Sequence, residues 1–340
     1  MVASPQRLPG VRDALRVWLK DVTNPPNLIR VMPAKGRQQV GLMLAPTASA
    51  IGFFMPVEGD RIPAMDREPP RPPVRTSLTI AGSDSGAGAG IQADLKTFAS
   101  LGVYGTSAVT AVTAQNTREV VAIAEVPEEV VGAQIDAVLE DIGAHSVKTG
   151  MLSSAPIISI VVDRLQAWGV EKLVVDPVMV SKGGNHLLQP AAVGSLRREL
   201  LPIALIVTPN IPEASVLAGR EIESDRDIED AARAIGSLGA TFVVVKGGHR
   251  QGEPIDTVFD GSVITQLPAK RVVTENTHGT GCTFSAAIAA YLTLGHDPME
   301  AIASAKEYIS AALRASYTIG RGHSPVNHFF GLYEQLVEPA

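Results

Sequence analysis

Short apolar runs rich in β-branched residues alternate with longer segments of helical periodicity from residue 74 onward. The short runs predict strands over residues 77–81, 105–112, 120–126, 146–149, 172–175, 205–208, 242–245, 257–259 and 263–267. The longer segments predict helices over residues 89–101, 127–142, 154–169, 190–200, 211–218, 225–238, 279–294 and 298–319. Several of these helices have a proline at or near their start, where a missing N–H costs little.

Residues 173–175 of one predicted strand and residues 242–245 of another are apolar at every position. Such strands are typical of a parallel sheet that is covered by helices on both faces. The alternation of strands and helices therefore predicts an α/β fold, a three-layer sandwich with a central, mainly parallel sheet. We expect one domain over residues 74–340.

Residues 1–73 differ in composition from the rest of the chain. They carry half of the 24 prolines and a net positive charge, whereas the remainder is acidic. This composition disfavours regular structure, so we expect a disordered or loosely structured leader. A weak likeness to a signal peptide over residues 32–50 is interrupted by Pro46. A later start of the natural chain, at Met65, is a second interpretation.

Composition narrows the classes of function. No apolar run reaches roughly eighteen residues, which argues against a membrane span. The net charge of −6 and the aromatic content of 4% argue against binding of nucleic acid. The single cysteine, Cys282, indicates a cytoplasmic protein rather than a disulfide-bonded one. The histidines show no spacing typical of a transition-metal site.

Polar clusters follow five of the predicted strands. They are Gly82-Ser83-Asp84-Ser85, Lys148-Thr149-Gly150-Met151, Asp176-Pro177-Val178-Met179, Thr208-Pro209-Asn210 and Lys246-Gly247-Gly248-His249. Ligands of open α/β sheets bind beyond the carboxyl ends of the strands. We therefore expect the five clusters to form one site.

A candidate phosphate site is the run Thr277-His278-Gly279-Thr280-Gly281-Cys282 at the start of a predicted helix. Its glycines can adopt positive φ, and the N–H groups of Gly279, Thr280 and Gly281 can then point at one anion. A thiol pKa is expected to fall in the first turn of a helix, so Cys282 is a candidate base for phosphoryl transfer. The alternative is an ordinary tight turn followed by a buried cysteine.

The glycine-rich stretch over residues 82–90 lacks both the spacing of a dinucleotide-binding loop and the lysine of a P-loop. It suits the close approach of a small ring to the backbone. Either Asp84 or Asp94 is a candidate hydrogen-bond acceptor for such a ring.

Seven segments together resemble one enzyme family. In order they are AGSDSGAGAGIQADLKTF, TAVTAQNT, VKTGML, VVDPVMVSKGG, TPNIPEA, VVVKGGH and NTHGTGCTFSAAIAA. They resemble the hydroxymethylpyrimidine and phosphomethylpyrimidine kinases of thiamine biosynthesis, in the ribokinase-like superfamily, over residues 77–330. The resemblance implies a ribokinase-like fold and two successive ATP-dependent phosphorylations, of hydroxymethylpyrimidine and then of its monophosphate.

The resemblance also implies roles for single residues. Gln115 would hydrogen-bond the aminopyrimidine, because an amide offers a donor and an acceptor together. The other residues implied near that ring are Asp94, Gly82, Ala89 and Met151. The residues implied at ATP are Asn210, Lys246 and Lys306. Asp176 and Glu213 would hold the water shell of Mg²⁺, and Cys282 stands where the superfamily usually has a catalytic aspartate.

Other interpretations stay open. Taken singly, Gln115 could be a loop amide, Asp94 a helix surface residue and Met151 a core residue. A pyridoxal kinase of the same superfamily is the nearest alternative function, and a non-catalytic ligand-binding module is a more distant one. The family also implies a homodimer. One departure from it is Ala87, where glycine is common.

Overall fold

The computed structural model describes residues 74–180, 187–249 and 252–332. The predicted leader over residues 1–73 lies outside these residues, and so do the last eight residues of the predicted domain. Among the described helices, none combines the length and the apolar character needed to cross a membrane.

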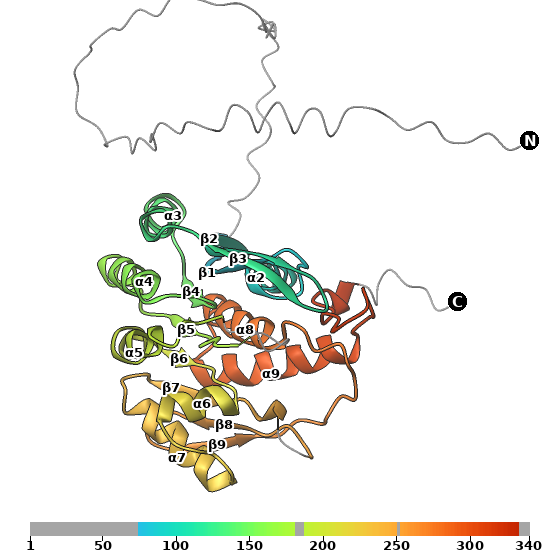
Figure 1. Ribbon diagram of the computed structural model, residues 1–340. Coiled ribbons are helices and arrows are strands. Elements are labelled where there is room, and N and C mark those ends of the chain that lie inside the picture. The colour runs from blue at the N-terminus through green and yellow to red at the C-terminus, as the bar shows by residue number, and fades with distance from the viewer. Residues whose placement is uncertain (1–73, 181–186, 250–251, 333–340) are drawn as a thin grey trace, which may run out of the picture. The chain divides into compact units, whose positions relative to one another are not determined.

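The described strands form one nine-stranded sheet in the order β3-β2-β1-β4-β5-β6-β7-β8-β9 (Figure 1). Its strands are β1 (Thr76–Asp84), β2 (Tyr104–Gln115), β3 (Val120–Glu125), β4 (Ser146–Thr149), β5 (Leu173–Val175), β6 (Ile206–Val207), β7 (Phe242–Val245), β8 (Asp256–Phe259) and β9 (Ile264–Leu267). The six neighbouring strands β2, β1, β4, β5, β6 and β7 are parallel to one another. The edge strands pair antiparallel: β3 with β2 at one edge, and β8 and β9 at the other. All predicted strands are confirmed.

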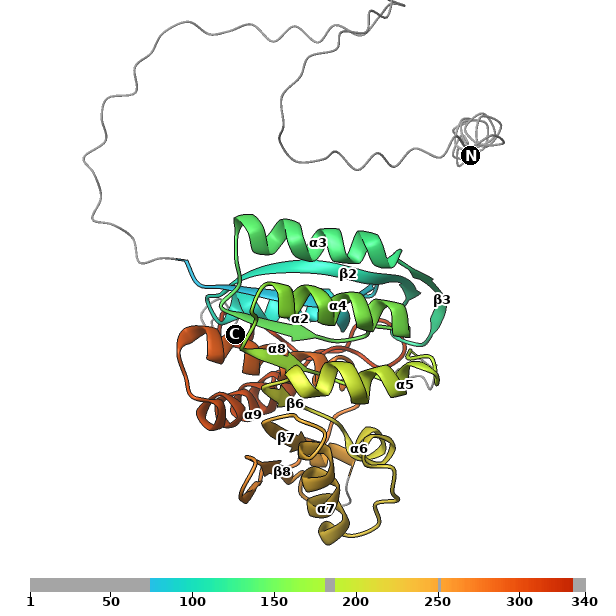
Figure 2. The same cartoon turned by 90° about the vertical axis from the view of Figure 1, so that its left-hand side faces the viewer.

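Helices cover both faces of this sheet (Figures 1 and 2). One layer contains α3 (Glu128–Asp141), α4 (Ala155–Ala167), α5 (Ala192–Ser195), α6 (Ile211–Ala218) and α7 (Asp225–Gly236). The other contains α2 (Gly90–Ser100), α8 (Thr280–Leu294) and α9 (Pro298–Arg314). The predicted three-layer sandwich is therefore confirmed.

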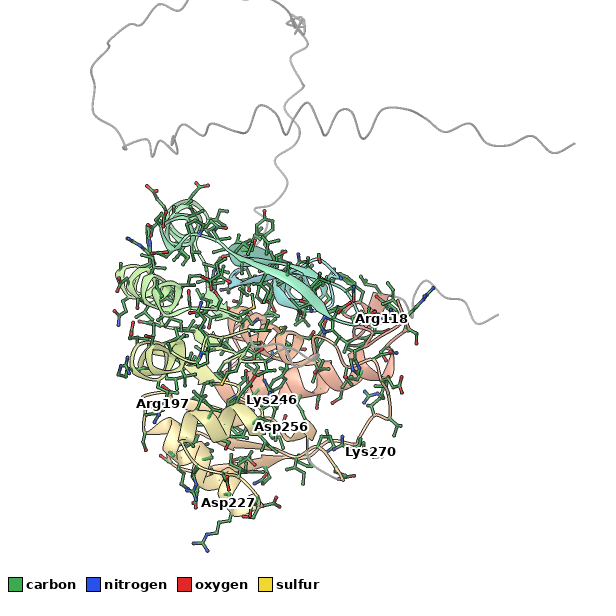
Figure 3. All side chains as sticks on the ribbon, viewed as in Figure 1. Arg118, Arg197, Asp227, Lys246, Asp256 and Lys270 are labelled. Atoms are coloured by element: carbon green, nitrogen blue, oxygen red, sulfur yellow. The ribbon has the colours of Figure 1, made fainter. Side chains whose placement is uncertain are left out.

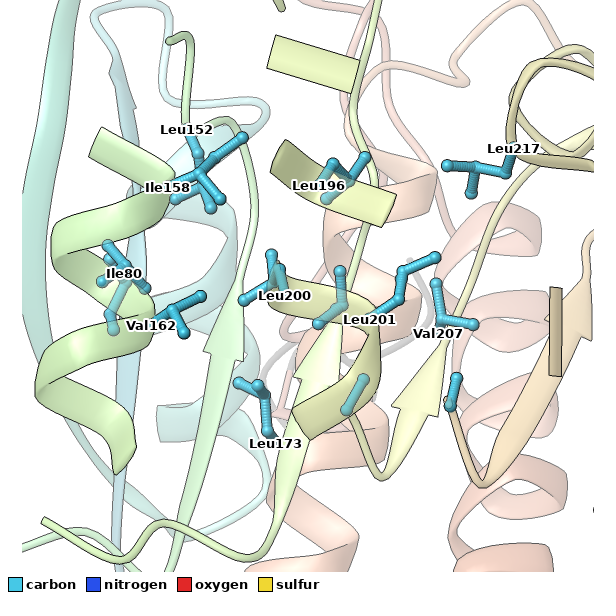
Figure 4. Packing of buried hydrophobic residues seen from close by; sticks show 14 of the residues in the cluster. Ile80, Leu152, Ile158, Val162, Leu173, Leu196, Leu200, Leu201, Val207 and Leu217 are labelled. Atoms are coloured by element: carbon cyan, nitrogen blue, oxygen red, sulfur yellow. The ribbon is translucent and has the colours of Figure 1, made fainter. Parts of the chain in front are cut away.

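Alternate residues of the central strands supply both cores. Leu173 and Val175 pack with the α3 to α7 layer, whereas Val174 between them packs with α8 and α9. Figure 4 shows part of the first cluster, in which Leu173 lies beside Leu200 and Leu201. This two-sided burial is the reason why these strands are apolar at every position.

Two predicted helices differ from the structure. Residues 190–200 form only the short α5, which continues as a π-helical turn, η1 (Leu196–Leu200), and a 3-10 turn, η2 (Leu201–Ile203). Pro202 has no N–H to donate, so a regular helix ends there. The last helix, α9, ends at Arg314 rather than at residue 319. Ile319 donates its N–H to Ser324 Oγ at 2.9 Å instead of to a helical carbonyl.

The segment after α9, residues 315–328, is here called the C-terminal strap. Its last five residues, 324–328, are buried, and His328 is only 3% exposed. The Nε2 atom of His328 lies 3.0 Å from Thr283 Oγ1, and Tyr308 donates its hydroxyl to the His328 carbonyl at 2.7 Å. Burial, together with the nearby charge of Lys96, lowers the pKa of His328 to about 4. The ring is therefore neutral at pH 7.

We expect His328 to make the protein acid-sensitive. The unfolded chain protonates this side chain near pH 6.5 and the folded chain only near pH 4. The unfolded state therefore binds more protons between these values, and stability falls as the pH is lowered from 6.5 to 4, by up to about 3 kcal/mol. Urea unfolding of the wild type and of His328→Gln across this range measures the effect. Equal pH slopes of the two proteins would contradict it.

Candidate active site

A cavity of about 840 Å³ opens at the carboxyl ends of the parallel strands. Its volume is in the range of sites that enclose small molecules. All five polar clusters contribute to its lining, as the sequence predicted. The predicted residues that line it are Gly82, Ala89, Gln115, Met151, Asp176, Asn210, Glu213, Lys246, Gly279, Thr280, Gly281, Cys282 and Lys306. Asp94 is the exception.

The first turn of α8 lies against the glycine-rich loop that precedes α2. Gly279 caps α8 with φ of 76°. A side chain at Gly279 would overlap the carbonyl of Gly88, and one at Gly88 would overlap the His278 ring. The first N–H groups of a helix have no partner within it, although that of Thr280 makes a long hydrogen bond of 3.5 Å to the Thr277 carbonyl. The predicted donors Gly279, Thr280 and Gly281 all line the cavity. Their role as phosphate ligands stays a prediction.

Asp84 organises the glycine-rich loop. Its carboxylate accepts hydrogen bonds from the N–H groups of Gly86, Gly88 and Ala89 at 2.8, 3.1 and 2.9 Å, and lies 2.9 Å from His278 Nε2. Burial would raise the pKa of Asp84, but His278 and these N–H groups lower it below its usual value. Asp84 therefore serves the loop rather than a ligand ring. The sequence offered a signal, because an aspartate ahead of glycines often caps a turn.

Ala87 occupies a glycine-like position in this loop. Its φ is 60°, which costs an alanine about 1 kcal/mol. The Ala87 carbonyl accepts a hydrogen bond from Lys96 Nζ at 2.8 Å. The methyl group of Ala87 thus adds backbone strain.

The structure corrects the assignment of Asp94 to the pyrimidine. This side chain is fully buried and does not line the cavity. It forms an ion pair with the equally buried Lys148, with its two oxygens 3.0 and 2.9 Å from Nζ, and it accepts a hydrogen bond from Thr79 at 2.6 Å. It is not on the helix surface either. Sequence analysis placed Lys148 in one of the polar clusters but did not pair it with Asp94.

Lys148 separates Asp94 from the cavity. Its side chain lines the cavity floor, so the positive end of the ion pair faces any ligand. Burial alone would lower the pKa of Lys148, but the charge and hydrogen bond of Asp94, together with Cys282 and Asp176, outweigh burial and raise this pKa. A cation buried here favours negative charge in the cavity.

The expected low pKa of Cys282 is wrong. The side chain is half-buried beside Lys148. Burial raises the thiol pKa to about 12, and the negative charges of Asp94 and Asp176 add to this effect. Lys148 and the N–H of Gly90 act in the opposite direction but do not compensate. Cys282 is therefore a neutral thiol in the protein without ligands, because burial and two acids outweigh the helix N-terminus.

Lys246 lies between the two predicted magnesium carboxylates. Its Nζ is 3.0 Å from Asp176 Oδ1 and 4.0 Å from Glu213 Oε2. Burial and the nearby Asp176 raise the pKa of Glu213 to about 7. Glu213 also accepts the N–H of Asn210, and Asn210 Oδ1 accepts the N–H of Glu213, each at 2.8 Å. This capping box fixes both residues at the start of α6.

A third lysine of the cavity lining is Lys306. Lys306 Nζ forms an ion pair with Asp256 at 2.7 Å and donates to the Pro254 carbonyl at 3.1 Å. Asp256 also accepts the N–H of Gly247 at 2.7 Å, so it ties α9 to the loop after β7. Figure 3 shows Lys246 and Asp256 in the middle of the molecule, with Lys270 nearer its edge. Sequence analysis missed Asp256.

Gln115 is the last residue of β2 rather than part of a loop. Its Oε1 accepts a hydrogen bond from Thr113 at 3.1 Å, and its Nε2 lies 3.4 Å from His278 Nε2. Nearby, a side chain at Gly82 would overlap the end of Met151. Gly82 and Met151 therefore pack together and form a wall of the same cavity.

Comparison with known proteins gives one consistent family. The profile of the phosphomethylpyrimidine kinase family matches residues 84–327. The hydroxymethylpyrimidine/phosphomethylpyrimidine kinase of Rhizobium meliloti is 52% identical over 257 residues, covering 74% of this chain and 96% of that protein. The bifunctional thiamine biosynthesis protein ThiED of Geobacter sulfurreducens is 52% identical over 252 residues, covering 74% of this chain and 51% of that protein.

A solved structure is similar as well. An ADP complex of Bacillus subtilis pyridoxal kinase superposes with a TM-score of 0.71 at 39% identity. The match covers 75% of this chain and 98% of that one. Both the fold and the sequence motifs are therefore shared with enzymes that carry the name kinase.

We expect the Asp94–Lys148 pair to tolerate joint replacement better than single replacement. Asp94→Asn leaves the Lys148 charge buried without its partner and should destabilise the protein by about 3–5 kcal/mol. Asp94→Leu combined with Lys148→Met buries no charge and should lose less. Urea unfolding measures both. As a control, Asp230→Asn breaks the exposed pair with Arg220 and should cost less than about 1 kcal/mol.

Proposed function

The chain belongs to the phosphomethylpyrimidine kinase family, and on this basis we propose that it phosphorylates hydroxymethylpyrimidine and then the resulting monophosphate. It is an ATP-dependent kinase, and its product, the pyrimidine diphosphate, serves thiamine biosynthesis. The observation that carries the proposal is that Gln115, Cys282 and the first turn of α8 line one cavity. An acceptor ring and a phosphate donor can therefore meet beside the thiol.

We assign the pyrimidine to the end of the cavity that contains Gln115. The amide of Gln115 can pair with a ring nitrogen and the exocyclic amine at once. Gly82, Ala89 and Met151 supply apolar surface for the two faces of the ring. Asp94 does not contact the ring; it forms an ion pair with Lys148, which lines this end of the cavity.

We assign ATP to the end of the cavity that contains Lys246, Asn210 and Lys306. The two ammonium groups can neutralise phosphate charge, and Asn210 is held at the start of α6 where an amide can face the nucleotide. The N–H groups of Gly279, Thr280 and Gly281 would stabilise charge that develops on the γ-phosphoryl group.

Mg²⁺ fits the carboxylates of Asp176 and Glu213. Both are almost fully buried, and they lie on either side of Lys246 Nζ, so their oxygens are close enough to serve one cation. Mg²⁺ commonly needs only one or two carboxylates, with waters and phosphates completing its shell. When bound, it would neutralise charge on the transferring phosphates.

Cys282 would relay a proton in the first transfer. As the substrate oxygen bonds to phosphorus, its hydroxyl proton passes to Sγ, and the thiol proton leaves for an oxygen of the γ-phosphoryl group. This exchange keeps sulfur neutral, in agreement with a pKa of about 12. In the second transfer the attacking phosphate oxygen is already ionised at pH 7 and needs no relay.

Pyridoxal kinase activity is the second candidate. The structural similarity to the Bacillus subtilis pyridoxal kinase favours it. The segment with Gln115 and the glycine-rich loop favour the pyrimidine instead. A non-catalytic module is the least favoured candidate, since a sensor has no need of the acids and amides assembled around the phosphates.

We further propose that the protein forms a homodimer and acts in the cytoplasm.

Product analysis tests the substrate. The full chain is incubated with ATP and Mg²⁺ and with either hydroxymethylpyrimidine or pyridoxal, and mass spectrometry identifies the products. We expect the pyrimidine monophosphate and then the diphosphate, with a higher kcat/KM for the pyrimidine than for pyridoxal. A higher kcat/KM for pyridoxal would move the assignment to the second candidate.

We expect Cys282→Ala to impair the two transfers unequally. Loss of proton transfer should lower kcat/KM of the first transfer by about 100-fold or more, and that of the second by less than about tenfold. Separate assays that start from the alcohol and from the monophosphate measure this. Cys282→Ser, which keeps an exchangeable proton, should lie between wild type and alanine. Equal losses in both assays would show that Cys282 only positions the substrates.

A further inference from the structure

The C-terminal strap contacts the cavity walls at two separate places. At one end it meets the turn between β2 and β3, directly after Gln115. At the other end it meets the first turn of α8. Figure 1 shows the tip of the β2–β3 hairpin reaching the red segment that follows α9, and Figure 3 labels Arg118 at that tip.

Thr117 holds the hairpin end. Its Oγ1 accepts hydrogen bonds from the N–H groups of Arg321 and Gly322 at 3.3 and 3.1 Å. Its carbonyl accepts the N–H of His323 at 2.8 Å. A side chain at Gly322 would overlap the Thr117 backbone, so a glycine is needed for this close approach. Three consecutive residues of the C-terminal strap thus donate hydrogen bonds to Thr117.

Ser324 and His328 hold the helix end. The carbonyl of Ser324 accepts the N–H of His278 at 3.1 Å, and Pro325 forms a bridge to the same residue. His328 Nε2 lies 3.0 Å from Thr283 Oγ1, one residue beyond Cys282. Both contacts lie within the run of residues 277–283 that presents the phosphate-binding N–H groups. Ser324 and His328 are 0% and 3% exposed, which marks this end as the rigid one.

The two ends are joined over a short distance along the chain. Ser324 Oγ bridges the N–H and the carbonyl of Ile319 at 2.9 and 2.8 Å. This closes residues 319–324 into a compact turn between the hairpin contact and the helix contact. Only a few hydrogen-bonded residues therefore separate the hairpin contact from the contact with His278.

We propose that the C-terminal strap sets the position of Gln115 relative to the first turn of α8, with Thr117 as its positioning residue. The proposal rests on the assignment of the pyrimidine to Gln115. Thr117 itself would contact neither ligand. The strap would act on Gln115 through the β2–β3 hairpin and on the first turn of α8 through His278. Binding of the pyrimidine at the hairpin would then be coupled to binding of ATP at α8.

Thr117→Val tests the proposal, because valine keeps the shape and removes the acceptor. Loss of these hydrogen bonds should raise the KM for hydroxymethylpyrimidine about five- to tenfold. Because coupling between two binding sites is reciprocal, the KM for ATP measured at saturating pyrimidine should also rise, by a smaller factor, with kcat nearly unchanged. Thr117→Ser keeps the hydroxyl and should restore the wild-type KM. Thr265→Val, on the far edge strand β9, is the matched control and should behave as wild type. An unchanged KM for the pyrimidine, or an unchanged KM for ATP at saturating pyrimidine, would overturn the proposal.

Amide hydrogen exchange provides a measurement that needs no substrate. In Thr117→Val, exchange should accelerate in the hairpin over residues 115–120 and also in residues 277–283. Acceleration confined to the hairpin would refute the coupling, whatever the substrate proves to be. If wild type fails to phosphorylate the pyrimidine while exchange changes at both places, the proposed function fails and the strap's positioning role stands.

Discussion

The site depends on one close contact between two turns of the backbone. Gly279 lies against the carbonyl of Gly88, and Gly88 lies against the His278 ring, so neither position has room for a side chain. This contact brings the N-termini of α2 and α8 together, although residues of the two turns are far apart in sequence. Both helix dipoles then act on the same part of the cavity, where Cys282 lies.

Buried charge is the second feature that shapes the cavity. Lys148 and Lys246 lie below it and are each paired with an aspartate, Asp94 and Asp176 respectively. Burying such pairs costs several kcal/mol, which an apolar core would avoid. These pairs hold charge at fixed positions. Each lysine lines the cavity and can stabilise an anion there without a rearrangement of the site during the reaction.

Most of the fold could be predicted from sequence, and the site in large part. Two-sided burial makes strands such as Leu173–Val175 recognisable, and their polar ends identify the cavity. The end of α9 could not be predicted. It depends on Ser324, which follows Arg314 by ten residues and forms hydrogen bonds with the backbone of Ile319. Asp94 was misassigned for a similar reason, since its partner Lys148 is distant in sequence and sequence spacing does not show which of the two faces the cavity.

The error on Cys282 has a different origin, and it bears on mechanism. Its position at a helix N-terminus was correctly predicted, but the electrostatic result depends on what surrounds the sulfur in three dimensions. Burial and two carboxylates outweigh one lysine and the helix dipole. A site that holds ATP phosphates must hold much negative charge, and a thiolate there would add to it. A neutral thiol avoids that repulsion, in agreement with the raised pKa of Cys282.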